Sequence, residues 1–141
     1  MTRATNEATL SKAIEAINAG DVEAGVNALF AEGAVDHDPA RGQGPGRAGF
    51  HAFFRTLSTA FPDLRLERRH LTANDDHVSM AFTVSGTHEG DFNGVPPSGR
   101  TFKVSGVEIF RFVDGQVVER WGLTDDMSLL GQLGLLSPPE H

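Results

Sequence analysis

The sequence predicts an α+β domain in which helices cover one face of a curved antiparallel sheet. Apolar residues recur at helical spacing through residue 61, alternate with polar residues from residue 64 onward, and an Asp-Gly turn separates the last two alternating runs. Helices followed by a run of antiparallel strands build this class of fold. A sheet that bends over a helix layer tends to leave a pocket where small ligands bind.

Three helices are predicted before the first strand. Residues 5–19 carry apolar side chains at steps of three and four, and a glycine ends the run. Residues 21–30 form a short second helix with an aspartate at its N-cap. The segment 34–39 leads into a glycine-rich loop. Residues 47–61 form a third helix with a strongly aromatic face, and Pro62 ends it.

The second half of the chain is predicted to be mostly sheet. Its strands show apolar residues at every second position and cover residues 64–66, 78–84, 101–112 and 116–121. A loop rich in glycine and proline, 89–99, joins two of the strands, and Asp114-Gly115 predicts a tight hairpin. A helix over 127–133 and a loose tail over 136–141 complete a single domain, 1–141, without an internal repeat.

The composition excludes several classes of function. The chain has 141 residues and a net charge of −7, which argues against nucleic-acid binding because such binding neutralises phosphates with Lys and Arg. It has no cysteine, so thiolate catalysis, zinc-thiolate sites and disulfides are excluded. No window reaches the roughly 18 apolar residues of a membrane span, and the start lacks a signal peptide. We therefore expect a cytoplasmic protein with no membrane partner.

Asp125 is the first candidate for chemistry. It follows the strand that ends near Trp121 and precedes the last helix. A carboxyl group beside apolar side chains loses solvation, so its pKa rises and it can act as a general acid or base near neutral pH. An aspartate directly before a helix is also an ordinary N-cap, which is the more common role. The neighbouring Asp126 could cap the helix while Asp125 faces the pocket.

His37 and Asp38 are candidates for substrate contacts. They could orient one another for proton transfer or bind a substrate oxygen, although Asp-Pro is also ordinary turn chemistry. A third ligand at recognisable spacing is missing, so we expect no metal.

His88 and Glu108 lie on predicted strands. His88 continues the alternation of 78–84 and points to the apolar face, either at the mouth of a pocket or as a core-edge residue satisfied by a backbone carbonyl. Glu108, within an apolar strand, is likewise a candidate for a substrate contact, and the simpler explanation is a pair with Arg111, Arg120 or another cation on a neighbouring strand. The sequence has no phosphate-binding glycine loop and no nucleophile elbow, which leaves proton transfer by carboxyl and imidazole groups.

Several ordered segments of the chain resemble the SnoaL-like polyketide cyclases, also called ester cyclases. The matching segments are Val35-Asp-His-Asp-Pro39, Ala60-Phe-Pro-Asp-Leu64, 86–100, 104–112, Val118-Glu-Arg-Trp-Gly122 and Leu129-Leu-Gly-Gln-Leu-Gly134. The resemblance covers most of the chain. It implies the nuclear transport factor 2-like fold, a cone of three N-terminal helices packed on a strongly curved antiparallel sheet, with a deep pocket and homodimers formed through sheet faces.

The resemblance also implies a reaction. Characterised members of the family close a ring of an aromatic polyketide by intramolecular aldol condensation, without metal or organic cofactor. Their acid/base carboxylate matches Asp125 by position, and Arg120 stands where many relatives have His in the motif Glu-His-Trp. Looser correspondence suggests the polar contacts His37, Asp38 and His88. Candidates for the pocket walls are the aromatic residues Phe53, Phe54, Phe82, Phe110 and Trp121.

Two classes of function remain open. The first is a cofactor-free cyclase acting on an enolisable, apolar small molecule. The second is a non-catalytic protein that binds a small apolar ligand, and a pocket hydrolase or isomerase of the same fold is a further alternative. We expect Asp125 to separate these hypotheses, because an enclosed carboxyl favours an enzyme and an exposed carboxyl that only caps a helix favours a binding protein.

Overall fold

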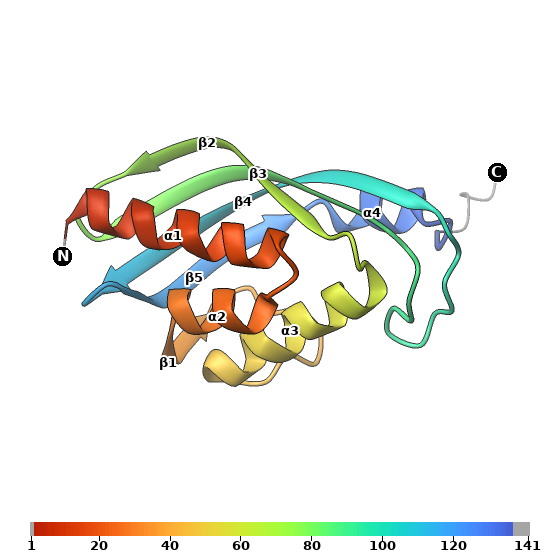
Figure 1. Ribbon diagram of the computed structural model, residues 1–141, viewed down its shortest axis with the longest axis horizontal. Coiled ribbons are helices and arrows are strands. Elements are labelled where there is room, and N and C mark those ends of the chain that lie inside the picture. Colours follow the sequence, from red (N-terminus) through yellow and green to blue (C-terminus); the bar gives the residue numbers. More distant parts are fainter. Residues whose placement is uncertain (1, 137–141) are drawn as a thin grey trace.

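A long curved sheet runs through the molecule, and helices cover one of its faces (Figure 1). The computed structural model describes residues 2–136, so residues 137–141 of the predicted tail lie outside the described residues. In chain order the elements are α1 (Arg3–Asn18), α2 (Val22–Leu29), β1 (Phe30–Asp36), α3 (Gly46–Ala60), β2 (Arg65–Ala73), β3 (His77–Thr87), β4 (Thr101–Val113), β5 (Gln116–Thr124) and α4 (Asp126–Gln132). The strands lie in the sheet in the order β1-β5-β4-β3-β2. The predicted α+β class is confirmed.

The strand β1 corrects the expected helix end at residue 30, the expected order of three helices before the first strand and the expected antiparallel sheet. Phe30–Asp36 forms a strand that pairs in parallel with β5. The sheet is therefore mixed, and β1 separates α2 from α3. Only Phe30 and Ala34 are deeply buried, and Gly33 interrupts the segment. Such a short segment carries too weak an alternation to be recognised as a strand.

The core lies between the sheet and the helices α1, α2 and α3. Along β3 every second side chain is buried, as the period of two predicts, and the face of β4 beside it carries further aromatic residues. The buried apolar residues of β3, β4 and β5 are Val78, Met80, Phe82, Val84, Phe102, Val104, Phe110, Phe112 and Val117. Because these residues point toward the helices, the alternating residues point to the opposite face.

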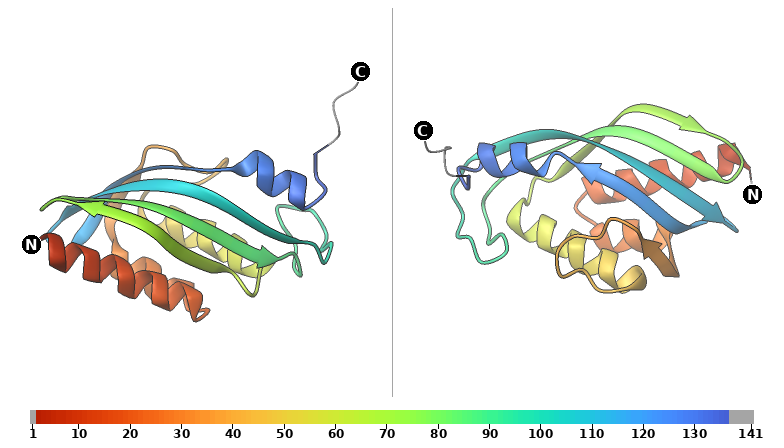
Figure 2. Two further views of the ribbon diagram at one scale, coloured as in Figure 1. Left: turned by 90° about the horizontal axis from the view of Figure 1, so that it is seen from above. Right: turned by 180° about the vertical axis from the view of Figure 1, so that it is seen from behind.

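The opposite face of the sheet carries exposed apolar side chains. Val107, Ile109 and Leu123 are 57%, 42% and 69% exposed. Val107 lies opposite Leu123, and Ile109 lies opposite Trp121, on the neighbouring strands β4 and β5. We call this face the open face, because α1, α2 and α3 all lie on the other side of the sheet (Figure 2). None of the described helices is long and apolar enough to cross a membrane.

The helix α4 is held where β5 ends. β5 pairs with β4 only as far as Thr124, opposite Gly106, so the backbone of Lys103 has no partner from β5. The Gln132 side chain takes the place of the missing strand: its Oε1 accepts from the Lys103 amide at 2.8 Å and its Nε2 donates to the Lys103 carbonyl at 3.1 Å. Buried Leu129 secures the same helix. This arrangement fixes the position of Asp125, which precedes α4, and of Asp126, which begins it.

Candidate active site

Asp125 is the N-cap of α4. Its Oδ1 accepts a hydrogen bond from the Ser128 amide at 3.1 Å, and its side chain is exposed. The cap falls on Asp125 because the last non-helical residue holds that role and the helix begins at Asp126. The sequence suggested that Asp126 caps the helix while Asp125 faces the pocket, and the assignment of the cap to Asp126 is wrong. The burial predicted for Asp125 is not found.

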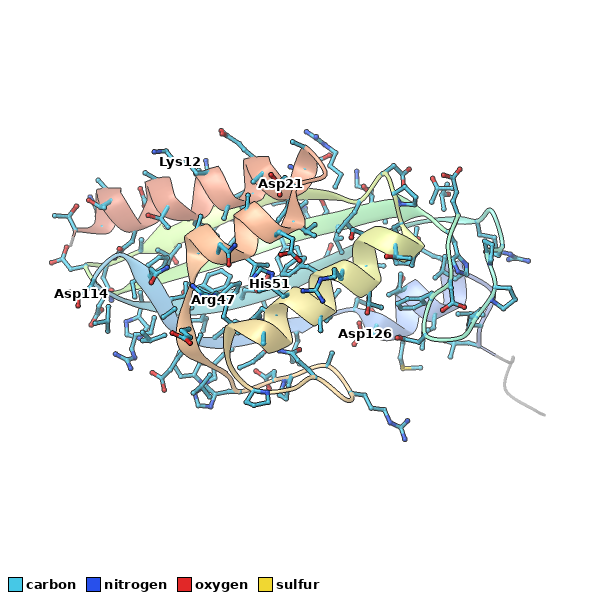
Figure 3. All side chains as sticks on the ribbon, turned by 60° about the horizontal axis from the view of Figure 1, so that its bottom comes forward. Lys12, Asp21, Arg47, His51, Asp114 and Asp126 are labelled. Carbon is cyan, nitrogen blue, oxygen red and sulfur yellow. The ribbon has the colours of Figure 1, made fainter. Side chains whose placement is uncertain are left out.

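Asp126, labelled in Figure 3, begins α4 and differs electrostatically from an ordinary surface carboxyl. Partial burial raises its pKa, and the negative charge of Asp125 raises it further. Two adjacent carboxyl groups, both exposed, therefore stand at the end of β5.

Asp125 lines an open groove of about 350 Å³ on the open face of the sheet. We call it the Asp125 groove. Its lining includes Leu123 and Val107 as apolar residues and Arg69 as a cation. The Arg69 Nη1 lies 3.4 Å from the hydroxyl of Ser105, which also lines the groove. The groove combines a carboxylate with apolar sides, but it is open rather than deep.

His37 and Asp38 do not orient one another. The His37 ring stacks on Trp121, with centroids 4.7 Å apart and an angle of 9° between the planes, and its Nε2 lies 3.1 Å from Glu119 Oε1. Glu119 also pairs with Arg111. These hydrogen bonds, first from Arg111 and then from His37, lower the pKa of Glu119. Trp121 lies opposite the exposed Ile109, which places this group on the open face.

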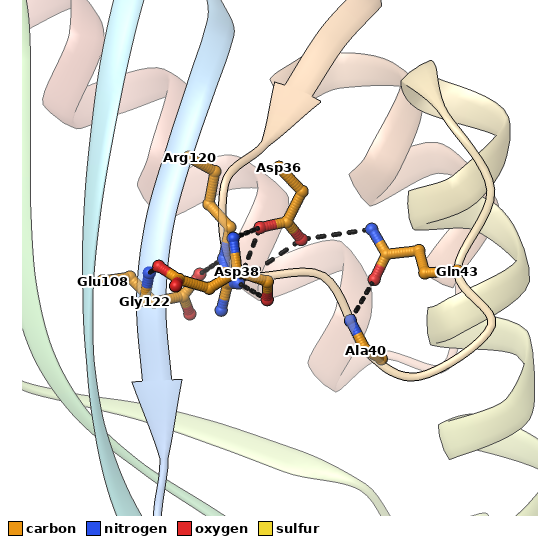
Figure 4. Close-up of polar contacts among 7 residues, drawn as sticks. All are labelled: Asp36, Asp38, Ala40, Gln43, Glu108, Arg120 and Gly122. Carbon is orange, nitrogen blue, oxygen red and sulfur yellow. Dashed lines mark hydrogen bonds and ion pairs between the residues drawn. The ribbon is translucent and has the colours of Figure 1, made fainter.

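A cluster of charged side chains lies on the helix-covered face, where Arg120 is opposite the buried Phe110. We call Asp36, Glu108 and Arg120 the ion-pair cluster (Figure 4). The Arg120 Nε donates to Glu108 Oε2 at 3.0 Å, and Nη1 donates to Asp36 Oδ1 at 3.0 Å. The side chains of Asp36, Arg120 and Glu108 are 7%, 14% and 17% exposed. Burial raises the pKa of Glu108, and the charge of Arg120 opposes that rise.

The surroundings of this cluster were only partly predicted. The pair between Glu108 and Arg120, one of the pairings proposed from the sequence, is confirmed. The parts played by Asp36 and Gln43 were missed: Gln43 Nε2 donates to Asp36 Oδ2 at 3.1 Å. Parallel pairing sets Asp36 beside Arg120, so recognising β1 as a strand would have revealed the contact. Asp38 holds the adjacent backbone, since its Oδ2 accepts from the Gly122 amide at 3.0 Å.

His88 is fully buried at the base of the 89–99 loop. Its Nδ1 accepts a hydrogen bond from the Ser98 amide at 3.3 Å and lies 3.0 Å from the Ser98 hydroxyl. Its ring lies near those of Phe61 and Phe92. The expectation that it points to the apolar face is confirmed. Its backbone partner is an amide rather than the expected carbonyl, and among the described residues its buried Nε2 has no hydrogen-bond partner.

The structure does not gather all the predicted residues around one hollow. Phe82 and Phe110 belong to the core, and the half-buried Phe54 packs against that core. Phe53 meets Phe54 edge to face at 5.3 Å. Glu108 and these aromatic side chains lie on the helix-covered face, whereas His37, Trp121 and the Asp125 groove lie on the open face. Within residues 2–136, no three His, Asp or Glu side chains are grouped so as to hold a metal ion.

Known structures share this architecture. TsrD from Streptomyces laurentii superposes with a TM-score of 0.86 at 29% identity, covering 96% of this chain and 99% of that one. AclR from Streptomyces galilaeus, described as a candidate hydroxylase, gives a TM-score of 0.83 at 32% identity and covers 96% of this chain and 100% of its own. The fold class is that of the nuclear transport factor 2-like proteins.

The sequence match identifies the family within that class. Residues 8–133 match the family model of the SnoaL-like polyketide cyclases. The aklanonic acid methyl ester cyclase DnrD of Streptomyces peucetius is 29% identical over 126 residues, which are 86% of this chain and 85% of the relative. The chain belongs to the SnoaL-like polyketide cyclase family, as the sequence resemblance indicated.

The capping role of Asp125 can be tested by stability. Asp125→Ala removes the acceptor for the Ser128 amide, so we expect it to lower the free energy of unfolding by about 1 kcal/mol. Asp125→Asn should cost less, because Asn caps helices about as well as Asp. Urea denaturation of both variants gives the values. Asp126→Ala is the matched control, and a larger loss in that control than in Asp125→Ala would contradict the assignment.

The burial of Glu108 predicts a pH dependence of stability. Its pKa is raised in the folded chain, so its favourable contribution is present below the unfolded pKa of about 4.3 and is lost as pH rises through the folded pKa. The Glu108→Gln variant has no carboxyl group to titrate, so it does not lose this contribution. Its free energy of unfolding, relative to that of the wild type, should therefore rise between pH 4 and pH 8, by about 1.4 kcal/mol for each unit by which the pKa of Glu108 is raised.

Urea denaturation across this pH range measures the difference between the two proteins. Glu67→Gln is the control, because Glu67 forms an exposed pair with Arg65. A difference between Glu108→Gln and the wild type that stays constant from pH 4 to pH 8 would refute the assignment.

Proposed function

We propose that this chain catalyses an aldol-type ring closure within an enolisable, apolar small molecule, without metal or organic cofactor. Family membership over residues 8–133 is the observation that carries this proposal. The names of the relatives DnrD and DauD describe cyclases of aklanonic acid methyl ester. That compound is therefore the first substrate to test on this chain.

Asp125 is the proposed acid/base group. Ring closure needs a base that removes a proton next to a carbonyl, after which the enolate carbon attacks a second carbonyl and the new alkoxide takes up a proton. One oxygen of Asp125 is held by the Ser128 amide, and no residue within 2–136 donates to Oδ2. Leu123 and Val107 flank it in the groove. A fixed carboxylate with one available oxygen can accept and return the proton.

The exposure of Asp125 favours a second candidate, a protein that binds a small apolar ligand without converting it. The Asp125 side chain is exposed, and the groove that it lines is open to solvent rather than enclosed. Turnover distinguishes the two candidates, because a binding protein would retain the ligand unchanged.

We also propose that a second copy of the chain covers the open face. Exposed Val107, Ile109 and Leu123 lie side by side on β4 and β5, and burying them would contribute favourable apolar contact. Val107 and Leu123 also line the Asp125 groove, so a partner on this face would remove water from around the proposed base.

Turnover of aklanonic acid methyl ester tests the proposed base. The wild type should form a product of the same mass with one new ring. Asp125→Asn should lower kcat by about 100-fold or more, since it keeps the cap but cannot accept the proton. Liquid chromatography with mass spectrometry follows both compounds. Asp126→Asn is the neighbouring comparison: if it removes activity while Asp125→Asn does not, the base is misassigned, and an inactive wild type that binds the compound supports the second candidate.

Sedimentation velocity tests the proposed dimer. We expect a dimer at micromolar concentration, and Leu123→Glu should give monomers because it places a charge in the apolar face. Ala52→Glu, on the exposed side of α3, should leave the dimer intact. A monomeric wild type at these concentrations would refute this part of the proposal.

A further inference from the structure

Arg69 is the extra residue of a β-bulge on the edge strand β2. The pairing between β2 and β3 shifts register between Arg68 and His70, so Arg69 between them has no partner on β3. A bulge re-aims the side chain that it inserts. Here the Arg69 side chain reaches across β3 to β4, where its Nη1 lies 3.4 Å from the Ser105 hydroxyl. The bulge therefore brings a guanidinium from the edge of the sheet into the Asp125 groove.

Ser105 is the point at which this cation approaches the proposed base. The Asp125 amide donates to the Ser105 carbonyl at 3.0 Å, which extends the pairing of β4 and β5 by one residue. Directly opposite residues of antiparallel strands have Cβ atoms about 5 Å apart and point to the same face. Because β5 and β3 lie on opposite sides of β4, the Asp125 carboxylate and the Arg69 guanidinium approach Ser105 from two sides.

The two charged groups line one groove without pairing. Among residues 2–136, Arg69 forms no ion pair with a carboxylate. The groove that Arg69 and Asp125 share has a volume of about 350 Å³ and apolar sides at Val107 and Leu123. Small-molecule sites begin at about this size. A small apolar ligand in the groove can therefore contact the cation and the carboxylate at the same time.

Removal of a proton next to a carbonyl would move negative charge across this groove. The C–H bond breaks, Asp125 takes the proton and becomes neutral, and the electron pair of that bond moves toward the carbonyl oxygen, which becomes an enolate oxygen. A cation at this oxygen interacts more strongly with the enolate than with the ketone, and such a difference lowers the barrier. Arginine suits this position because it stays charged and donates several N–H groups to oxygen.

We propose that Arg69 binds the carbonyl oxygen of the substrate and stabilises the enolate that Asp125 generates. This inference rests on the proposed function and adds the group that receives the charge. The enolate carbon then attacks the second carbonyl, and Asp125 returns its proton to the new alkoxide. Asp125 is negative before it takes the proton, so it repels a free enolate in the wild type. A neutral side chain at position 125 removes that repulsion.

The enolate of dimedone tests this site without turnover. Dimedone is an enolate anion at neutral pH, and its enol methyl ether keeps the ring but carries no charge. Ligand-observed NMR measures the dissociation constants of both probes with the full-length protein. Asp125→Asn should bind the enolate about fivefold more tightly than the wild type, which is the upper range for charges exposed to water. The enol ether should bind to both proteins equally.

Arg69→Gln, introduced into Asp125→Asn, removes the cation. It should weaken binding of the enolate by about fivefold and leave binding of the enol ether unchanged. Arg68→Gln in the same background is the matched control, because Arg68 is the neighbouring exposed arginine and is not part of the groove lining. Equal enolate binding by these two double variants would overturn the proposal. So would the absence of enolate binding by Asp125→Asn at millimolar concentration.

Turnover of aklanonic acid methyl ester separates this inference from the proposed function. If the wild type does not convert the ester but Arg69→Gln weakens enolate binding, the reaction is refuted and the oxygen site is supported. If Asp125→Asn abolishes turnover while Arg69→Gln leaves enolate binding unchanged, the base is supported and the role of Arg69 is refuted. In an active protein, Arg69→Gln should lower kcat more than it raises KM, because its contact strengthens as the enolate forms.

Discussion

The alternation of side chains along β4 and β5 decides which of the functional candidates can meet. Successive residues of a strand point to opposite faces, so Glu108 and Arg120 face the helices while Trp121 and Leu123 face away. A single sheet of backbone separates the two sets. For this reason, residues that are neighbours in the sequence, such as Arg120 and Trp121, lie in two different chemical environments.

Alternation also explains how far the sequence could predict the structure. The period of two in β3 is complete, and it placed His88 correctly on the buried face. The pair between Glu108 and Arg120 was within reach because both residues belong to recognisable strands. The strand β1 could not be predicted, because its few buried residues give too weak a signal. Without that strand, the place of Asp36 in the ion-pair cluster could not be predicted either. The cap at Asp125 depended on where the helix begins, which sequence patterns locate only within a few residues.

The ion-pair cluster is a constraint on geometry more than a source of stability. Removing charges from water costs several kcal/mol per ion, and their mutual attraction returns that cost only when the hydrogen bonds are well formed. Here Arg120 joins β5 to both the end of β1 and the neighbouring β4. The cluster therefore fixes the parallel pairing at Asp36, where β1 ends and the chain turns toward Gln43.

Asp125 has two proposed roles, the helix cap and proton transfer, and both use the same carboxylate. The Ser128 amide holds one oxygen of Asp125 in the cap, and proton transfer requires the other oxygen to meet a substrate rather than solvent. Removing water from the Asp125 groove would favour that contact. The exposed apolar residues that share this groove, Val107 and Leu123, are also those that a second copy would cover. If a partner excludes this water, proton transfer and association become linked, and specific activity should rise with protein concentration through the range in which the dimer forms.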